Sequence, residues 1–405
     1  MNFKGVFFVL FYFTFIGISS CQDNENPNKV YFEINSEDRK ITVPTYFNDS
    51  IAANLIFDTG GSFIIDSAFC ATHNFPDLNL ASNVRESNGS EWSTIKTSGL
   101  IYDTPLTIRI GNADLTFDNF RVWDWRSYMH CDNDGLFNIP ANDTRIWELN
   151  FEHNYLEIHE DEEFKLPDDC ITLSMVIDGV YYPFFVQIPM EITFADGDSI
   201  TLNQYFFIDT GMPWDVALIT PTREEYDFFD RRDDAIWTWY QDGYSRYYTV
   251  NANLFDSFQI DSLRVYTFDI SFKKGSHYLV GLNFLKRFNV FFDMKNQQIG
   301  LQPINNFKRL YNPNHKRLYY IPSPDSEGNI IVRKVAHNKD NPYKIAGLKE
   351  GDEIVALNGT LCKNISSEEY TELKDNGNIY RYDILRDGKA MTITVVMNKD
   401  EVQGD

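Results

Sequence analysis

Short runs of apolar residues recur along most of the chain, and Gly, Asn and Asp separate them. Runs such as "ITVPTYF", "LTIRI", "EITF" and "SLRVYTFDI" are rich in β-branched and aromatic residues. Runs of this length and composition, bounded by turn-forming residues, are typical of β-strands. We therefore expect a mainly β protein.

Two of the apolar runs end on a carboxylate inside the same triplet, Asp-Thr-Gly. The stretch "ANLIFDTGGSFIID" contains Asp58, and "NQYFFIDTGMPWDVALI" contains Asp209. Similar blocks follow each triplet in the same order: "DGLFNI" and "ELNFEHNYLEI" after the first, "YLVGLNFL" and "NVFFDMKNQQIGL" after the second. A repeated order of blocks indicates an internal repeat, so we expect two all-β lobes.

The first residues, "MNFKGVFFVLFYFTFIGISSC", have the pattern of an export signal: one lysine, an apolar run and then small residues ahead of Cys21. The apolar run is short for a membrane span. "ISSC" resembles the lipobox of bacterial lipoproteins, in which the cysteine becomes the lipid-modified N-terminus. The alternative is an ordinary cleaved signal peptide with an incidental cysteine. Gln22 fits retention at the outer membrane under the lipoprotein rule.

Composition limits the classes of function. The chain has 405 residues, 43% of them hydrophobic, so it is long enough for two or three domains with sizeable cores. With 59 acidic and 36 basic residues the net charge is -23, which argues against nucleic acid as a partner. After Cys21, the cysteines are scattered without a C-x-x-C pair, and no H-E-x-x-H occurs, so zinc sites of the common kinds are not expected. Disulfides and free buried thiols both remain open.

The two triplets and the later "LVG" at residues 279–281 resemble the aspartic proteases, specifically the retropepsin-like bacterial type with both halves in one chain. The resemblance covers roughly residues 28 to 306. A single Asp-Thr-Gly is expected by chance on the order of 0.1 times in a chain of this length. Two triplets, each behind an apolar run and each followed by a matching block, are a much more specific signal.

The resemblance implies that Asp58 and Asp209 are the catalytic pair. Two carboxylates about 3 Å apart cannot both ionise, so they share one proton and hold a water between them. The ionised carboxylate takes a proton from the water, and the protonated one donates to the substrate carbonyl. Thr59 and Thr210 would tie the two turns together, and Gly60 and Gly211 would permit the tight bend. This chemistry requires no cofactor and no metal ion.

The sequence departs from the family pattern mainly in the first copy. Gly61 and Met212 stand where pepsin-like enzymes have Ser or Thr, and Asn138 stands where a glycine matching Gly281 is expected. Two interpretations follow: an active protease with a relaxed first lobe, or a degenerate scaffold that binds peptides without cutting them. Two further alternatives are that the triplets are ordinary turns of an unrelated β protein, and that each lobe needs a second chain to complete its site.

Aromatic-rich stretches follow each triplet at distances that suit the flaps that cover a substrate. Trp92 lies in "SEWSTIKTSGLIYDT", and Trp237 and Trp239 lie in "AIWTWYQDGYSRYYTV". These side chains either cover an extended peptide or pack in a core or between the lobes. The neighbouring stretch "TREEYDFFDRRDDAIW" is expected to be a solvated helical insertion.

The composition changes after the linker "PINNFKRLYNPNHK". The stretch "GNIIVRKVAHNKDNPYKIAGLKEGDEIVALNGT" resembles a bacterial PDZ domain, with Gly347, Gly351 and Gly359 in turns around the strand "EIVALN". PDZ domains add a peptide as an extra strand. The expected binding loop near "KRLYYIPS" lacks the usual glycine pair, so this domain either captures a carboxylate or docks on the lobes.

The sequence thus predicts two acid-protease-like β-barrel lobes related by a pseudo-twofold axis, followed by a small α+β PDZ domain. The expected boundaries are a signal peptide at 1–21, a tether at 22–29, lobes at 30–164 and 165–306, and the PDZ domain at 315–400. We expect an aspartic endopeptidase that acts on peptides or unfolded proteins, or else a non-catalytic peptide-binding lipoprotein. We also expect a monomer with an intrachain pseudo-dimer, lipid-anchored to the outer membrane of a Gram-negative bacterium.

Overall fold

The computed structural model describes residues 28–34, 39–73, 84–88, 98–129, 131–160, 164–177, 184–219, 221–232, 234–240, 243–255, 258–268, 278–308, 319–325, 327–336, 340–365, 369–370, 373 and 378–397. The expected signal peptide with Cys21, and Trp92, lie outside these residues. Within the described part the protein is mainly β, as the sequence predicts, with three sheets and five short helices.

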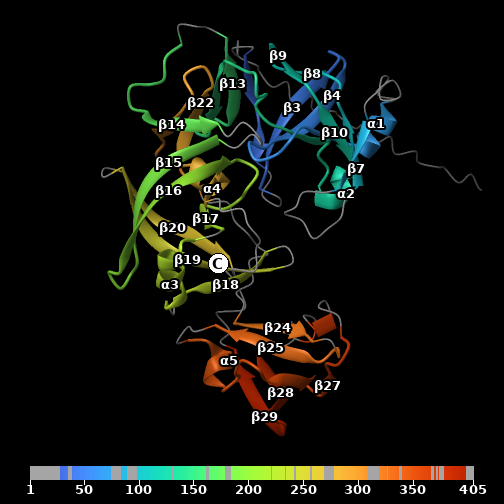
Figure 1. Ribbon diagram of the computed structural model, residues 1–405, viewed down its shortest axis with the longest axis vertical. Coiled ribbons are helices and arrows are strands. Elements are labelled where there is room, and N and C mark those ends of the chain that lie inside the picture. The colour runs from blue at the N-terminus through green and yellow to red at the C-terminus, as the bar shows by residue number, and fades with distance from the viewer. Residues whose placement is uncertain are drawn as a thin grey trace, which may run out of the picture.

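The first sheet contains ten strands within the described residues. Their order is β6-β7-β10-β5-β11-β4-β3-β8-β9, and β2 pairs with β3. The strands are β2 (Glu33–Ile34), β3 (Ile41–Phe47), β4 (Ile51–Phe57), β5 (Ile64–Asp66), β6 (Val84–Asn88), β7 (Ser98–Tyr102), β8 (Leu106–Ile110), β9 (Ala113–Phe117), β10 (Phe120–Trp123) and β11 (Gly135–Phe137). Helices α1 (Ser67–Thr72) and α2 (Trp125–Met129) both contact β5, and Figure 1 shows them near β7 and β10.

The second sheet contains thirteen strands of the described chain. Their order is β1-β13-β12-β22-β23-β14-β15-β16-β21-β17-β20-β19-β18. The strands are β1 (Lys29–Tyr31), β12 (Ile146–Asn150), β13 (Tyr155–His159), β14 (Ile171–Ile177), β15 (Phe184–Thr193), β16 (Ser199–Asp209), β17 (Val216–Leu218), β18 (Ile236–Tyr240), β19 (Gly243–Leu254), β20 (Phe258–Phe268), β21 (Tyr278–Gly281), β22 (Phe288–Asp293) and β23 (Gln298–Pro303). Helices α3 (Arg223–Asp230) and α4 (Leu282–Leu285) connect its strands.

The strand pairing repeats, and we name residues 41–159 the first repeat and 184–303 the second. In the first repeat β4 pairs with β3 and, in parallel, with β11, while β11 pairs with β5 and β5 with β10. In the second repeat β16 pairs with β15 and, in parallel, with β21, while β21 pairs with β17 and β17 with β20. The repeated blocks of sequence therefore occupy equivalent strands.

The two repeats share one sheet. Hairpin β12–β13 of the first repeat and hairpin β22–β23 of the second are joined because β12 pairs antiparallel with β22, with Trp147 opposite Phe292. Phe57, the last residue of β4, stacks on Trp147 with ring centroids 5.9 Å apart and meets Phe292 at 6.4 Å. All three side chains are buried in a core that spans both repeats. The end of β4 is thus packed against the sheet that both repeats share.

The C-terminal residues form a separate six-stranded sheet in the order β24-β25-β26-β28-β29, with β27 paired to β26 (Figure 1). Its elements are β24 (Tyr320–Pro324), β25 (Ile330–Val335), α5 (Pro342–Ile345), β26 (Glu353–Leu357), β27 (Thr360–Leu361), β28 (Ile379–Arg386) and β29 (Lys389–Val396). The predicted strand "EIVALN" is β26. Gly347, Gly351 and Gly359 adopt φ values of 90°, 86° and 83°, so the predicted glycine turns are confirmed.

One expectation about the second repeat is wrong. The helix expected in a solvated insertion is present as α3, begun by a capping box between Thr222 and Glu225. However, α3 buries Phe228 and Phe229, and the ring of Phe229 packs against Tyr248 at 5.1 Å. The acidic residues around these phenylalanines make the stretch polar on average, so its sequence does not predict a buried apolar face.

The structure also bears on thiols and membrane spans. Cys70, Cys170 and Cys362 are free cysteines, and Cys70 and Cys362 are buried. Burial raises the pKa of the Cys70 thiol to about 12, so this thiol is unreactive at neutral pH. Within the described residues, no helix is long and apolar enough to cross a membrane.

The separate cores generate a prediction about truncation. A chain ending at Lys308 should keep both repeats folded, because the C-terminal sheet has its own apolar cluster and the repeats share another. Ending at Lys308 retains Phe307, whose ring lies 3.8 Å from the Arg287 guanidinium. Thermal unfolding followed by circular dichroism should show one cooperative transition within a few degrees of that of the full chain. Loss of all cooperative structure would mean that the C-terminal sheet is integral to the repeats.

Candidate active site

The two Asp-Thr-Gly triplets form equivalent turns at the ends of equivalent strands. Asp58 follows directly on β4, and Asp209 is the last residue of β16. In the first turn the Gly61 amide donates to the Asp58 carbonyl at 3.1 Å. In the second, the Met212 amide donates to the Asp209 carbonyl at 3.2 Å. The same local hydrogen bond therefore sets both bends.

The two threonines join the turns through a reciprocal set of hydrogen bonds. The Thr59 amide donates to Thr210 Oγ1, and the Thr210 amide donates to Thr59 Oγ1, both at 3.0 Å. Each hydroxyl then donates across the axis to the strand that precedes the other triplet. Thr59 Oγ1 donates to the Ile208 carbonyl at 2.7 Å, and Thr210 Oγ1 to the Phe57 carbonyl at 3.0 Å. Both threonines are fully buried, so water does not compete for these bonds.

The glycines bring the two carboxylates together. A Cβ atom added at Gly60 would lie 2.8 Å from Asp209 Cγ, and one added at Gly211 would lie 2.2 Å from Asp58 Cγ. Each glycine thus faces the carboxylate of the other turn, and any larger residue would collide with it. The structure places all six residues of the two triplets at one site within one chain.

The electrostatics of the pair are those of two carboxyls in contact. Asp58 Oδ1 accepts a hydrogen bond from the Gly60 amide at 2.8 Å. Asp209 Oδ1 is covered from solvent and has no hydrogen-bond partner within the described residues. Burial, together with the charge of Asp58, raises the pKa of Asp209 to about 8. Asp209 therefore holds a proton at a pH where an ordinary aspartic acid would be ionised.

Lys40 is a charged neighbour that sequence reasoning missed. It precedes β3, and its Nζ donates to the carbonyl of Gly211 in the second turn. Its charge opposes the rise in the pKa of Asp209. A lone lysine ahead of a strand gives no signal of such a contact, because the contact crosses from one repeat to the other.

The two departures in the first copy have a physical basis. Asn138 occupies the position of Gly281, and its side-chain amide donates to the Gly61 carbonyl at 2.9 Å. A Cβ atom at Gly281 would meet the Met212 carbonyl oxygen at 2.5 Å, so the second repeat has no room for a side chain there. A Cβ atom at Gly61 would lie 2.6 Å from Leu136 Cδ1, which excludes Ser or Thr without repacking.

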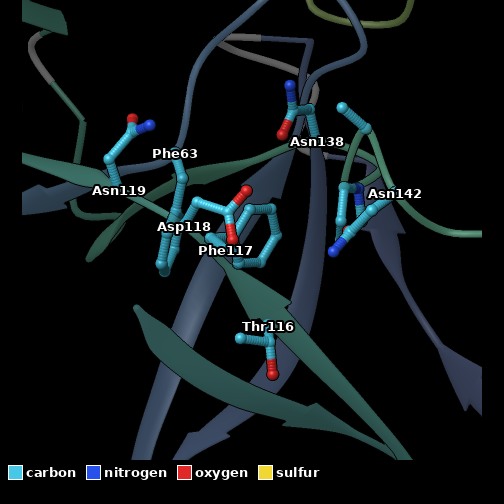
Figure 2. A pocket seen from close by; sticks show the side chains of 9 residues that line it. Phe63, Thr116, Phe117, Asp118, Asn119, Asn138 and Asn142 are labelled. Atoms are coloured by element: carbon cyan, nitrogen blue, oxygen red, sulfur yellow. The ribbon is translucent and has the colours of Figure 1, made fainter. Parts of the chain in front are cut away.

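Asn138 also borders a small pocket, whose lining side chains Figure 2 shows. Its volume is about 30 Å³, and its lining includes Phe63, Asp118, Asn119 and Asn142. This volume suits ordered water hydrogen-bonded to polar side chains and is too small for a peptide side chain.

The predicted flap residues are only partly located. Trp237 and Trp239 lie on β18, opposite Arg246 and Tyr244 of β19 in an antiparallel hairpin. In the first repeat β6 and β7 form a hairpin, and Trp92 lies between them, outside the described residues. Whether the three tryptophans cover a substrate stays a prediction.

Within the described residues, one further group has the donor atoms of a metal site. Glu148, Glu157 and His159 offer ligand atoms within 4.8 Å of one another on β12 and β13. Glu148 already accepts hydrogen bonds from Asn150 at 2.9 Å and Tyr155 at 2.6 Å, and it lies 2.9 Å from His159 Nε2. Burial opposes ionisation of Glu148, but these three partners lower its pKa. We interpret the group as a structural network in the shared sheet.

Comparisons with known proteins add no support to the resemblance to aspartic proteases, which therefore rests on the residues described above. No protein-family model matches the sequence, and a search of curated proteins found no match. The geometry of the two turns is therefore the main support for a function.

The threonine exchange generates a prediction about stability. Thr210→Val should lower the free energy of unfolding by about 2–4 kcal/mol, because the buried Thr59 amide and Phe57 carbonyl would lose their partner. Thr210→Ser keeps the hydroxyl and should cost much less. Urea unfolding of both variants measures the difference. Equal stabilities of the valine and serine variants would show that the exchange does not hold the turns together.

The raised pKa of Asp209 generates a prediction about pH. A carboxyl whose pKa rises from about 4 in the unfolded chain contributes its full stability below pH 4 and loses it as the pH rises toward about 8. Asp209→Asn removes this loss of stability. The melting temperature of the variant relative to that of the wild type should therefore increase steadily from pH 4 to pH 8. Asp114→Asn, which changes an exposed carboxylate, is the control. A melting-temperature difference between Asp209→Asn and the wild type that varies with pH no more than that of the control would contradict the raised pKa.

Proposed function

We propose that the protein is an aspartic endopeptidase whose catalytic pair is Asp58 and Asp209. The observation that carries the proposal is the meeting of two Asp-Thr-Gly turns, each with its glycine against the other carboxylate. The raised pKa of Asp209 supports it, because the pair then holds one proton and one negative charge at mildly acidic to neutral pH.

In the proposed reaction, Asp58 is the ionised member and Asp209 carries the shared proton. Asp58 takes a proton from a water held between the carboxyls as the water oxygen attacks the peptide carbonyl. Asp209 donates its proton to the carbonyl oxygen, which gives a neutral gem-diol. The carbon–nitrogen bond then breaks as Asp58 gives its proton to the leaving amine and Asp209 takes a proton from a hydroxyl of the gem-diol, which becomes the carboxylic acid product, so the pair returns to ionised Asp58 and protonated Asp209. The two carboxyls thus exchange roles within one cycle.

The remaining parts of the proposal concern architecture. We take the two repeats as acid-protease lobes, since the repeated pairing pattern places both triplets on equivalent strands. We take the C-terminal sheet as a PDZ domain that docks a peptide or partner, on the strength of its sequence and its glycine turns. The lipid anchor at Cys21, export to the outer membrane and a monomeric state are proposed from the sequence alone.

A non-catalytic peptide-binding protein is the second candidate, and Asn138 is the observation that favours it. In the second repeat the position is glycine, whereas in the first a side chain fills it. The pair itself argues for the enzyme. A scaffold that only binds peptides gains nothing from two carboxyls held in contact at one site, because their burial and their repulsion when both are ionised oppose folding.

The proposal is tested by cleavage of a mixed peptide library by the full chain between pH 3 and pH 8, with and without a transition-state-type aspartic protease inhibitor. Asp58→Asn and Asp209→Asn should each lower kcat/KM by about a thousandfold or more, and the double variant should lose little beyond either single one. Each single change removes the charge asymmetry that activates the water.

Asp114→Asn is the matched control, since it removes an exposed carboxylate on β9, and it should retain activity. The pH profile of the wild type should rise and fall with two apparent pKa values that belong to the pair. Ordinary cleavage by Asp58→Asn together with loss in Asp209→Asn would refute an intrachain pair. Peptide binding without cleavage at any pH would favour the second candidate.

A further inference from the structure

The contact between Lys40 and the second turn breaks the symmetry of the site. The threonine exchange and the glycine–carboxylate approaches each occur in both directions between the turns. Within the described residues, the Lys40 contact occurs in one direction. Its Nζ donates to the carbonyl of Gly211, so a cation that directly precedes β3 is fixed on the turn that carries Asp209.

The register of the strands identifies the corresponding position in the second repeat. Thr42 lies opposite Ile56 in the first repeat, and Phe185 lies opposite Phe207 in the second. Ile56 and Phe207 both stand two residues before the catalytic aspartate, so Thr42 and Phe185 are equivalent. Two residues earlier, the sequence has Lys40 ahead of β3 and Pro183 ahead of β15. Proline carries no charge, so the second copy of the sequence has no cation at the position that corresponds to Lys40.

We infer that Lys40 is a positioning residue of the carboxyl pair, which holds the Gly211 turn and places a positive charge on the Asp209 side. Its catalytic meaning rests on the proposed function. Its electrostatic effect on the two carboxyls does not, because that effect requires only that they share one site.

The charges around Asp209 give the direction of the effect. Burial and the neighbouring charge of Asp58 favour the protonated form of Asp209, and Lys40 favours the ionised form. Arg39, the preceding residue, interacts electrostatically with Tyr266 and Arg264 of β20. Lys40 thus opposes proton uptake by Asp209. Without it, Asp209 would keep the shared proton to a higher pH, and the pair would become doubly ionised only at a more alkaline pH.

Three substitutions separate the charge of Lys40 from its hydrogen bond. Lys40→Met removes both, Lys40→Gln keeps a donor without the charge, and Lys40→Arg keeps the charge and a donor. Lys29→Met is the control for loss of one positive charge elsewhere, since Lys29 lies over the ring of Tyr155 at 4.2 Å on the shared sheet. All variants are made in the full chain, and each is also combined with Asp209→Asn.

The first measurement does not depend on proteolysis. In each background, the melting temperature is measured with and without Asp209→Asn across the pH range. The difference stops increasing at the pH that equals the pKa of Asp209 in the folded protein, and we call this pH the plateau. In the Lys40→Met and Lys40→Gln backgrounds this plateau should move upward by about one pH unit, and in the Lys40→Arg and Lys29→Met backgrounds it should stay in place.

The second measurement is the pH profile of kcat/KM, whose basic limb reports the loss of the shared proton and should move upward by the same amount in Lys40→Met. A shifted plateau without any proteolysis would support Lys40 and refute the proposed function. Proteolysis with an unshifted plateau and profile in both Lys40→Met and Lys40→Gln would support the function and overturn the inference about Lys40. A shift in Lys40→Met alone would assign the effect to the hydrogen bond and would overturn the electrostatic part.

Discussion

The reciprocal hydrogen bonds between Thr59 and Thr210 are the contact on which the rest of the site depends. They join two turns that are 151 residues apart in sequence. The carboxylates themselves repel when both are charged, so they cannot provide this connection. The threonines use neutral donors and acceptors that are fully buried, and their energy is independent of pH. A connection of this kind holds the two aspartates together while leaving their protonation free to change.

The apolar core explains why the turns reach this geometry at all. Phe57 packs on Trp147 and Phe292, so the end of β4 rests on the sheet that both repeats build. Glu148, Tyr155 and His159 then hold β12 and β13 together within that sheet through buried hydrogen bonds. The position of Asp58 is therefore set by packing and by polar contacts that are remote from it in sequence.

The sequence predicts the elements of the site and misses the contacts between them. Asp58 and Asp209 are readable because a triplet behind an apolar run is a local pattern, and Gly347 and Gly351 are readable because turns require positive φ. Lys40, the shared sheet and the burial of α3 are not readable. Each depends on which surface meets which, and neither periodicity nor spacing within one segment carries that information. The protease and PDZ identities, the flaps and the anchor stay predictions.

The pairing of β12 with β22 has a consequence for how the chain acquires its chemistry. Antiparallel strands so distant along the polypeptide pair slowly, because closing the long loop between them costs conformational entropy before any stabilising contact forms. An emerging chain has no complete carboxyl pair until the second repeat is present. Under the proposed function, such late assembly would keep the chain from cleaving its own unfolded segments before its second repeat has folded.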